Sequence, residues 1–209
     1  MSLIDESNLP RLCRKLARRD NRLAGSLSQY GPPPLWARTP GFATLLQIIL
    51  EQQVSLASAR ACFDKLCERV VELTPESLIN STDAELRADG FSRQKAAYGR
   101  HIAQAVAENR IDLTDFDSLS DADVKSRLTM LKGVGEWTSD IYLLMALGRP
   151  DVMPKGDIAL HSAWQKLSGG PRPNSDEFLR IADAWRPYRS VAARMLWHFY
   201  LSERKKGPG

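Results

Sequence analysis

Apolar residues recur at the three- and four-residue spacing of an α-helix along almost the whole chain. The alternation of apolar and polar residues that marks a strand is hard to find. Helix starts are also marked locally, by Thr74-Pro75 and by the capping box Thr82-x-x-Glu85. With 209 residues the chain can bury a sizeable core, in one domain or in two small lobes. The pattern therefore predicts an all-α protein of about ten helices.

Two features indicate how these helices are organised. Gly31-Pro32-Pro33-Pro34 predicts a rigid extended linker, and the apolar stretch from Phe42 to Leu50 predicts a buried central helix. We expect an N-terminal helical segment over residues 1–39 that packs with the C-terminal lobe. A central helical lobe is expected over residues 40–130, followed by the C-terminal helices over residues 131–209.

The formal net charge of +4 gives a mild preference for polyanionic partners. Its distribution is more informative, because five cations are expected on one face of an N-terminal helix, opposite apolar residues. They are Arg11, Arg14, Lys15, Arg18 and Arg22. A solvated helix face is the simpler interpretation, and a contact for a polyanion is the alternative.

Cysteine usage and hydropathy exclude several classes of protein. Cys13, Cys62 and Cys67 lack CxxC spacing, which argues against a disulfide framework or a zinc site. No cysteine follows Cys67, so a C-terminal four-cysteine iron–sulfur loop cannot form. No apolar run approaches the roughly 20 residues of a membrane span, and the N-terminus has no signal-peptide core. We therefore expect a cytoplasmic protein.

A glycine turn between two predicted helices carries the clearest functional signal, in Leu131-Lys132-Gly133-Val134-Gly135-Glu136-Trp137-Thr138. Glycines permit positive φ and leave backbone N–H groups uncovered, and such groups at a helix start favour an anion. An ordinary corner between two helices is the alternative. Further along, Pro154-Lys155-Gly156-Asp157 places one carboxylate at the start of the next helix. A grip on a phosphate backbone followed by a lone acid suggests chemistry on a nucleotide.

Three further segments accompany this pair. They are Gly41-Phe42 with Ile48-Ile49-Leu50-Glu51-Gln52-Gln53-Val54-Ser55, then Gly90-Phe91-Ser92-Arg93-Gln94-Lys95-Ala96, and Arg186-Pro187-Tyr188-Arg189-Ser190. In this order, the four signatures resemble the helix-hairpin-helix (HhH-GPD) DNA glycosylase superfamily, and most nearly its 3-methyladenine DNA glycosylase II branch. The resemblance implies a two-lobed helical fold with the active-site cleft between the lobes. It also implies a monomer that acts on damaged double-stranded DNA and associates with the nucleoid.

The implied reaction flips an alkylated purine, of the 3-methyladenine or 7-methylguanine type, out of the duplex and hydrolyses its N-glycosidic bond. Asp157 is the catalytic candidate, because a carboxylate can stabilise the oxocarbenium-like sugar and orient or deprotonate the attacking water. A helix cap is the alternative role for Asp157. Family members that also cut the strand carry a lysine where this chain has Trp137, and an indole cannot form a Schiff base. A glycosylase without β-lyase activity is therefore expected.

Other roles follow from position and from the resemblance. Candidates for contact with the flipped base are Trp137, Tyr188, Gln52, Gln53, Trp36 and Trp185. Candidates for contact with the DNA backbone are Lys132, Gly133, Val134, Gly135, Thr138, Arg93, Lys95 and Ser190. Phe91 is either a wedge that enters the base stack or a hydrophobic staple for the next helix.

The resemblance further implies that backbone carbonyls of Thr129, Leu131 and Val134 hold a monovalent cation, K⁺ or Na⁺. No other cofactor is expected, and no iron–sulfur cluster. Two alternatives to alkylpurine excision remain at this point. One is the same fold acting on another damaged base, and the other is a non-catalytic DNA-binding or damage-scanning protein in which Asp157 only caps a helix.

Overall fold

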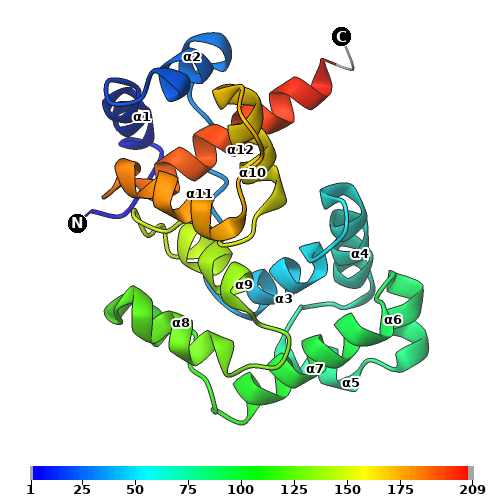
Figure 1. Ribbon diagram of the computed structural model, residues 1–209. Helices are drawn as coiled ribbons and strands as arrows, with labels where there is room; N and C mark the ends of the chain where they lie inside the picture. The colour runs from blue at the N-terminus through cyan, green and yellow to red at the C-terminus, as the bar shows by residue number, and fades with distance from the viewer. Residues whose placement is uncertain (1, 207–209) are drawn as a thin grey trace. The chain divides into compact units, whose positions relative to one another are not determined.

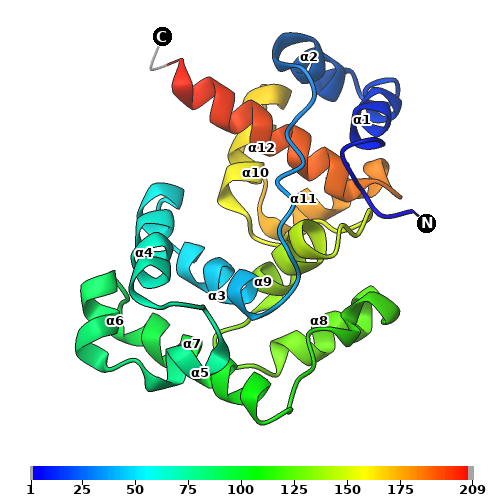
Figure 2. The same cartoon turned by 180° about the vertical axis from the view of Figure 1, so that it is seen from behind.

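The computed structural model describes residues 2–206 and divides the chain into two compact units (Figures 1 and 2). Unit 1 combines Met1–Ala37 with Leu143–Gly209, and unit 2 is the continuous segment Arg38–Tyr142. Across the described residues the regular structure is helical and no strand occurs, which confirms the predicted all-α class. Within residues 2–206, no helix combines the length and the apolar character that crossing a lipid bilayer requires.

Unit 2 is built around α3 (Phe42–Glu51), which is buried along most of its length and packs on α4, α7 and α9. The other helices are α4 (Leu56–Arg69), α5 (Pro75–Asn80), α6 (Asp83–Asp89), α7 (Arg93–Ala107), α8 (Asp121–Thr129) and α9 (Glu136–Ile141), with a short 3₁₀ turn at Asp115–Ser118. Local signals set most of their starts. Thr74 and Thr82 both form capping boxes, and the side chains of Ser92 and Ser120 cap α7 and α8.

Unit 1 is built around α12 (Arg189–Lys205), against which α1 (Leu9–Ala17), α2 (Asn21–Tyr30) and α10 (Ile158–Ser168) pack. It also contains α11 (Ser175–Ala182) and a 3₁₀ turn at Asp183–Trp185. The segment 31–37, here called the strap, leads away from α2 and is tied to α12. Arg194 in α12 is fully buried, and its Nε donates to the Leu35 carbonyl of the strap at 2.8 Å.

Two expectations about chain organisation differ from the structure. The glycine turn and α9 belong to unit 2, because α9 packs on α3 and α8, so the units divide after Tyr142 and not near residue 130. The apolar sequence after the glycine turn, which predicts one continuous helix over residues 137–147, instead forms α9 followed by a π-helix at Tyr142–Ala146.

The N-terminal segment contains two helices where one was expected. The first ends at Ala17, and Asp20 caps the second, accepting hydrogen bonds from the backbone N–H groups of Arg22 and Leu23. Arg22 therefore lies on α2, apart from the other four cations. Trp185, a weaker candidate for the base pocket, belongs to the core of unit 1, where its Nε1 donates to Asp20 at 2.9 Å.

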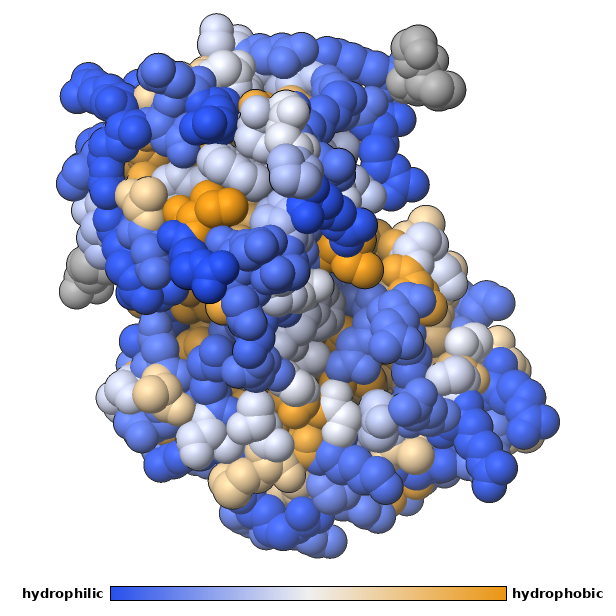
Figure 3. All heavy atoms as spheres, viewed as in Figure 1, coloured by the Kyte–Doolittle hydropathy of each residue, from blue (hydrophilic) through white to orange (hydrophobic). Residues whose placement is uncertain are grey.

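Hydrophilic residues dominate the face of the molecule seen in Figure 3, and apolar residues reach the surface in small patches. The large apolar side chains exposed among the described residues are Leu3, Val54, Leu56, Val71, Met130 and Ile158. Val54 lies in the turn between α3 and α4, and Leu56, two residues later, is the first residue of α4.

Candidate functional site

Asp157 begins α10 and is 8% exposed. Its Oδ1 accepts the backbone N–H of Leu160 at 3.0 Å, which is the capping bond expected of a helix-starting aspartate. The same oxygen accepts a second, longer hydrogen bond from Nε1 of Trp197 at 3.3 Å. The alternative role of Asp157 as a helix cap is therefore real, but it does not describe the site fully. Two donors from different helices fix the orientation of the carboxylate.

Trp197 is the main residue near Asp157 that sequence reasoning missed. It lies on α12, is 8% exposed, and brings an indole ring against the carboxylate. The available signal was weak, because a buried indole N–H needs some acceptor but the sequence does not say which. Only the packing of α10 on α12 brings the two side chains together.

His161 lies one helical turn after Asp157 and is buried, with its ring centroid 4.9 Å from that of Phe178. Its Nε2 has no hydrogen-bond partner among the described residues. Burial lowers the pKa of His161, the charge of Arg172 lowers it further, and Asp157 acts in the opposite direction. Burial thus disfavours the protonated form of this imidazole.

Trp36 lies on the strap and is brought to α12. Its backbone has φ +50, an uncommon value for a bulky residue, and its ring meets that of His198 edge-on at 6.4 Å. His198, the residue after Trp197, also makes a hydrogen bond through Nε2 with the carbonyl of Tyr30, the last residue of α2, at 3.0 Å. Trp36 thus has a strained backbone, and its half-buried indole lies against α12, the helix that carries Trp197.

Tyr188, expected at the base pocket, lies elsewhere. Its hydroxyl accepts a hydrogen bond from Nζ of Lys15 at 3.3 Å, and the same ammonium group lies 4.8 Å from the ring centroid. Tyr188 precedes Trp197 by nine residues, which is about 13 Å along a helix axis. The structure therefore groups Tyr188 with α1 and not with Asp157.

The glycine turn of unit 2 has the predicted form of a tight hairpin. The N–H of Val134 donates to the carbonyl of Leu131 at 3.0 Å, and Gly133 has φ +94. A Cβ on Gly133 would lie 2.4 Å from the Tyr98 ring, so the fold itself requires that glycine. Gly135 is different, because its φ of −102 suits any residue and an added Cβ would meet nothing within 4 Å. The fold therefore does not require a glycine at position 135, and the absence of a side chain there leaves the backbone accessible.

The hairpin is braced from α3. Gln52 donates from Nε2 to the carbonyl of Gly133 and to Oγ1 of Thr138, both at 2.9 Å. Gln52 was expected at the pocket and Thr138 at the DNA, but Thr138 is 1% exposed and both are engaged in this brace. Lys132, Gly135 and Glu136 are exposed, while Val134 is buried and anchors the turn.

Three expected DNA contacts are used internally. Ser190 is fully buried, and its hydroxyl donates to the carbonyl of Val152 and accepts from its N–H. Lys95 donates from Nζ to the carbonyl of Leu50 at the end of α3, and burial lowers its pKa. Phe91 is 5% exposed and lies against the site of Gly99 in the following helix, which favours the staple alternative over the wedge. Arg93 remains exposed at the start of α7.

The loop after Gln52 is a better candidate for a wedge. Gln53 is exposed and has φ +57, and Val54 and Leu56 are 45% and 58% exposed. These exposed apolar side chains lie close in sequence to Gln52, which braces the hairpin, and they could enter a base stack. In the sequence, the indication of this role was the apolar pair Val54 and Leu56, which resembles ordinary sequence at the start of a helix.

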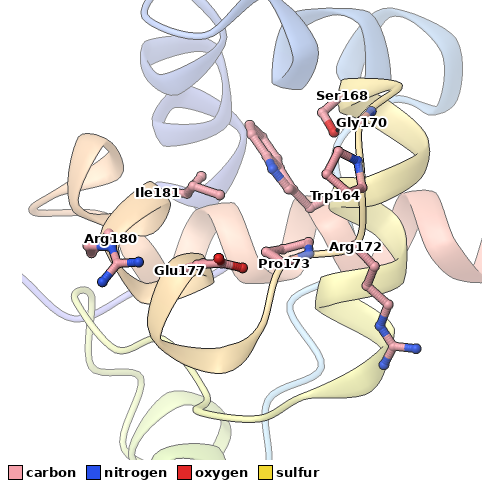
Figure 4. Close-up of a pocket in the computed structure, with 9 residues that line it drawn as sticks. Trp164, Ser168, Gly170, Arg172, Pro173, Glu177, Arg180 and Ile181 are labelled. Carbon is pink, nitrogen blue, oxygen red and sulfur yellow. Dashed lines mark hydrogen bonds between the residues drawn. The ribbon is translucent and has the colours of Figure 1, made fainter.

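Unit 1 also contains a cavity of about 790 Å³ between the end of α10 and α11. It is lined by Trp164, Ser168, Gly170, Pro171, Arg172, Pro173, Glu177, Arg180 and Ile181. In Figure 4 the side chains of Arg172 and Arg180 point away from each other, on opposite sides of Glu177. Asp157 does not line this cavity, so it is separate from the carboxylate site.

The expected cation ligands are backbone carbonyls at the hairpin and not side chains. Among residues 2–206, no group of three or more His, Cys, Asp or Glu side chains is arranged to hold a metal ion. The carbonyls of Thr129, Leu131 and Val134 lie within one short turn, and that of Leu131 already accepts the Val134 N–H. Backbone carbonyls are hard oxygen donors, the chemistry that suits a monovalent ion.

The comparisons with known proteins agree with this geometry. Residues 46–187 match the HhH-GPD superfamily of base excision DNA repair proteins. An alkylbase DNA glycosidase-like protein of Schizosaccharomyces pombe is 25% identical over 208 residues, covering 96% of this chain and 98% of that protein. DNA-3-methyladenine glycosylase 1 of the same yeast is 28% identical over 181 residues, covering 84% and 79%.

Solved structures show the same fold. The S. pombe 3-methyladenine DNA glycosylase in complex with abasic DNA superposes with a TM-score of 0.83 at 24% identity, covering 93% of this chain and 97% of that chain. A DNA-3-methyladenine glycosidase from Bacillus halodurans gives 0.75 at 27% identity, covering 99% and 95%. The family match spans well over half of the sequence, and the chain belongs to the HhH-GPD superfamily of base excision DNA repair proteins.

Proposed function

We propose that this protein is a monofunctional DNA glycosylase that excises alkylated purines, such as 3-methyladenine and 7-methylguanine, from double-stranded DNA. The observation that carries the proposal is the fixed carboxylate of Asp157, hydrogen-bonded by Leu160 and by the indole of Trp197. The relatives named as 3-methyladenine glycosylases support the choice of substrate.

The chemistry follows from the charge on an alkylated purine. Such a base is cationic and leaves as a neutral molecule, so a protonating partner is less necessary. The sugar left behind is oxocarbenium-like, and a preoriented carboxylate stabilises it and can deprotonate the attacking water. The lowered pKa of His161 suits this role, because a neutral imidazole leaves the negative field of Asp157 uncompensated for a cationic substrate.

Aromatic side chains would hold the flipped base. A cationic purine over an indole face gains cation–π energy of about 1–2 kcal/mol when desolvated. Trp197 and Trp36 are the candidates in unit 1, and Trp137 is the candidate in unit 2. An indole at position 137 cannot attack the sugar carbon as an amine would, so strand cleavage through a Schiff base is not expected.

Unit 2 would hold the DNA strand. The open backbone at Gly135, with Lys132 beside it, would bind phosphate, and the carbonyls of Thr129, Leu131 and Val134 would hold a K⁺ or Na⁺ ion. The exposed side chains of Val54 and Leu56 would fill the gap left by the flipped nucleotide. Phosphate contacts of this kind position the duplex but read no sequence.

The decisive experiment measures release of free base from alkylated duplex DNA. Asp157→Asn should lower the release rate by about a hundredfold or more and leave DNA affinity unchanged. Wild-type-like release by this variant would remove Asp157 from the mechanism. Efficient borohydride trapping of the wild-type enzyme on damaged DNA would contradict the absence of lyase activity.

A matched pair of variants tests the indole. Trp197→Phe removes the hydrogen bond to Asp157, whereas Trp185→Phe removes an equivalent indole–carboxylate bond, to Asp20, in the core. Both should lose some stability, but only the first should lower base release. Release of a different lesion would favour another damaged base, and DNA binding without any turnover would favour the damage-scanning alternative.

A further inference from the structure

Helix α1 presents an exposed basic face. Its apolar side is buried by Leu9, Leu12, Cys13 and Leu16. The opposite side exposes Arg11, Arg14, Lys15 and, at the C-terminal end, Arg18. We call these four side chains the α1 basic face. Helix α1 contains no acidic residue, so nothing on the helix itself neutralises this face.

Several other exposed arginines of the molecule are paired with a carboxylate, whereas within residues 2–206 the arginines of the α1 basic face are not. Arg60 is paired with Asp64 at 2.7 Å, Arg110 with Glu108 at 2.7 Å, and Arg127 with Asp115 at 3.4 Å. Among the described residues, Arg11, Arg14 and Arg18 have no ion pair. The nearest aspartates along the chain are engaged locally, since Asp5 caps the turn before α1 and Asp20 caps α2.

This arrangement acts against the stability of α1. Arg11 and Lys15 are four residues apart, as are Arg14 and Arg18, and like charges at this spacing repel on a helix. A helix face that is merely solvated usually mixes both signs and gains from such pairs. An unpaired, single-sign row is therefore better explained by a partner of opposite charge than by solubility.

The helix is also held in a fixed orientation. Arg19, just beyond it, donates to the carbonyls of Ala184 and Arg186 at 2.7 and 3.0 Å. Lys15 contacts the ring and hydroxyl of Tyr188. The backbone of α1 is thus fastened to the start of α12, while the guanidinium groups of Arg11, Arg14 and Arg18 remain in solvent.

We propose that the α1 basic face is a second DNA-binding surface, which contacts backbone phosphates of the duplex outside the lesion. Arg11 and Lys15, and likewise Arg14 and Arg18, are four residues apart, which is about 6 Å along the helix axis. This closely spaced row of cations suits the dense negative charge of a nucleic-acid backbone. Lys15 lies beside Tyr188 at the start of α12, about 13 Å along the helix axis from Trp197, so this surface is separate from Asp157. It contributes affinity for undamaged DNA and not the chemical step.

The test compares binding of undamaged duplex DNA at several salt concentrations. The triple variant Arg11→Gln, Arg14→Gln, Arg18→Gln keeps good helix formers at these positions. It should weaken binding at least roughly tenfold at moderate salt and lower the slope of log affinity against log salt by about two to three. Its rate of base release at saturating enzyme, in a single turnover, should equal that of the wild type.

A matched control removes three cations that are already paired, in Arg60→Gln, Arg110→Gln, Arg127→Gln. It makes the same change in net charge, so an equal loss of salt dependence in both variants would overturn the proposal. A triple variant that binds like the wild type would also overturn it, and so would one with a clearly lowered melting temperature. The binding assay needs no turnover, so it gives an answer even if the proposed excision activity is not found.

Discussion

The two units reach their structures by different means. Unit 2 is one continuous segment, and its helices start at local signals such as the capping boxes of Thr74 and Thr82. Unit 1 joins both ends of the chain, and contacts between distant residues hold it together. The clearest is Arg194, whose guanidinium donates to the carbonyls of Leu35, Ser190 and Leu144. Interactions between residues close in sequence specify the helices of unit 2, whereas unit 1 forms only when segments far apart in the sequence are brought together.

The largest expected effect comes from removing that guanidinium. Burial lowers the pKa of Arg194 to about 10, yet the group stays charged at neutral pH and serves three carbonyls. Arg194→Met should cost about 3 kcal/mol or more of unfolding free energy, because buried carbonyls lose their donors. Hydrogen exchange should show lost protection in α2, α10 and α12 but not in α3 and α7. An equal loss of protection in both units would show that Arg194 does not stabilise unit 1 selectively.

The hairpin glycines provide the next contrast, within unit 2. Gly133→Ala should cost about 2 kcal/mol, because its Cβ would overlap the Tyr98 ring and its φ is positive. Gly135→Ala should change stability by less than about 0.5 kcal/mol but weaken DNA binding, since it covers open backbone. Urea unfolding and DNA titration of both variants separate the two roles. Equal stability losses would mean that Gly135 is also structural.

Removing a local helix cap should cost less unfolding free energy than removing the buried guanidinium of Arg194. Thr82→Ala removes the capping box of α6, in which Thr82 and Glu85 exchange hydrogen bonds. The expected cost is about 1 kcal/mol, confined to fraying of α6 in hydrogen exchange. A larger effect that spreads to α3 would show that unit 2 is less modular than its sequence suggests.

The smallest expected effect is a pH dependence in unit 1. Burial lowers the pKa of His161 below its value in the unfolded chain, so the unfolded state takes up a proton that the folded state resists. Stability should therefore fall as the pH decreases from 7 towards 5, and should not change above pH 7 on this account. His161→Gln should reduce that slope in urea unfolding measured at several pH values. An unchanged slope would assign it to other groups.

Sequence reasoning was most successful where the signal is local. The helical class, the helix starts at Thr74 and Thr82, the glycine turn, and the start of α10 at Asp157 all depend on residues within one helical turn of each other. The order of the motifs also indicated the family correctly. The structure differs from expectation where one side chain had two plausible environments, as for Lys95 and Ser190, each of which is buried or hydrogen-bonded inside its unit.

By itself, the sequence determined the helical architecture, the family and the placement of a carboxylate at a helix start. Only the tertiary structure decided what surrounds that carboxylate and what braces the hairpin. Trp197 reaches Asp157 across 40 residues, and Gln52 reaches Gly133 across 81. Helix caps and periodicity are set by neighbours three or four residues away, but contacts at such separations exist only after the helices have packed.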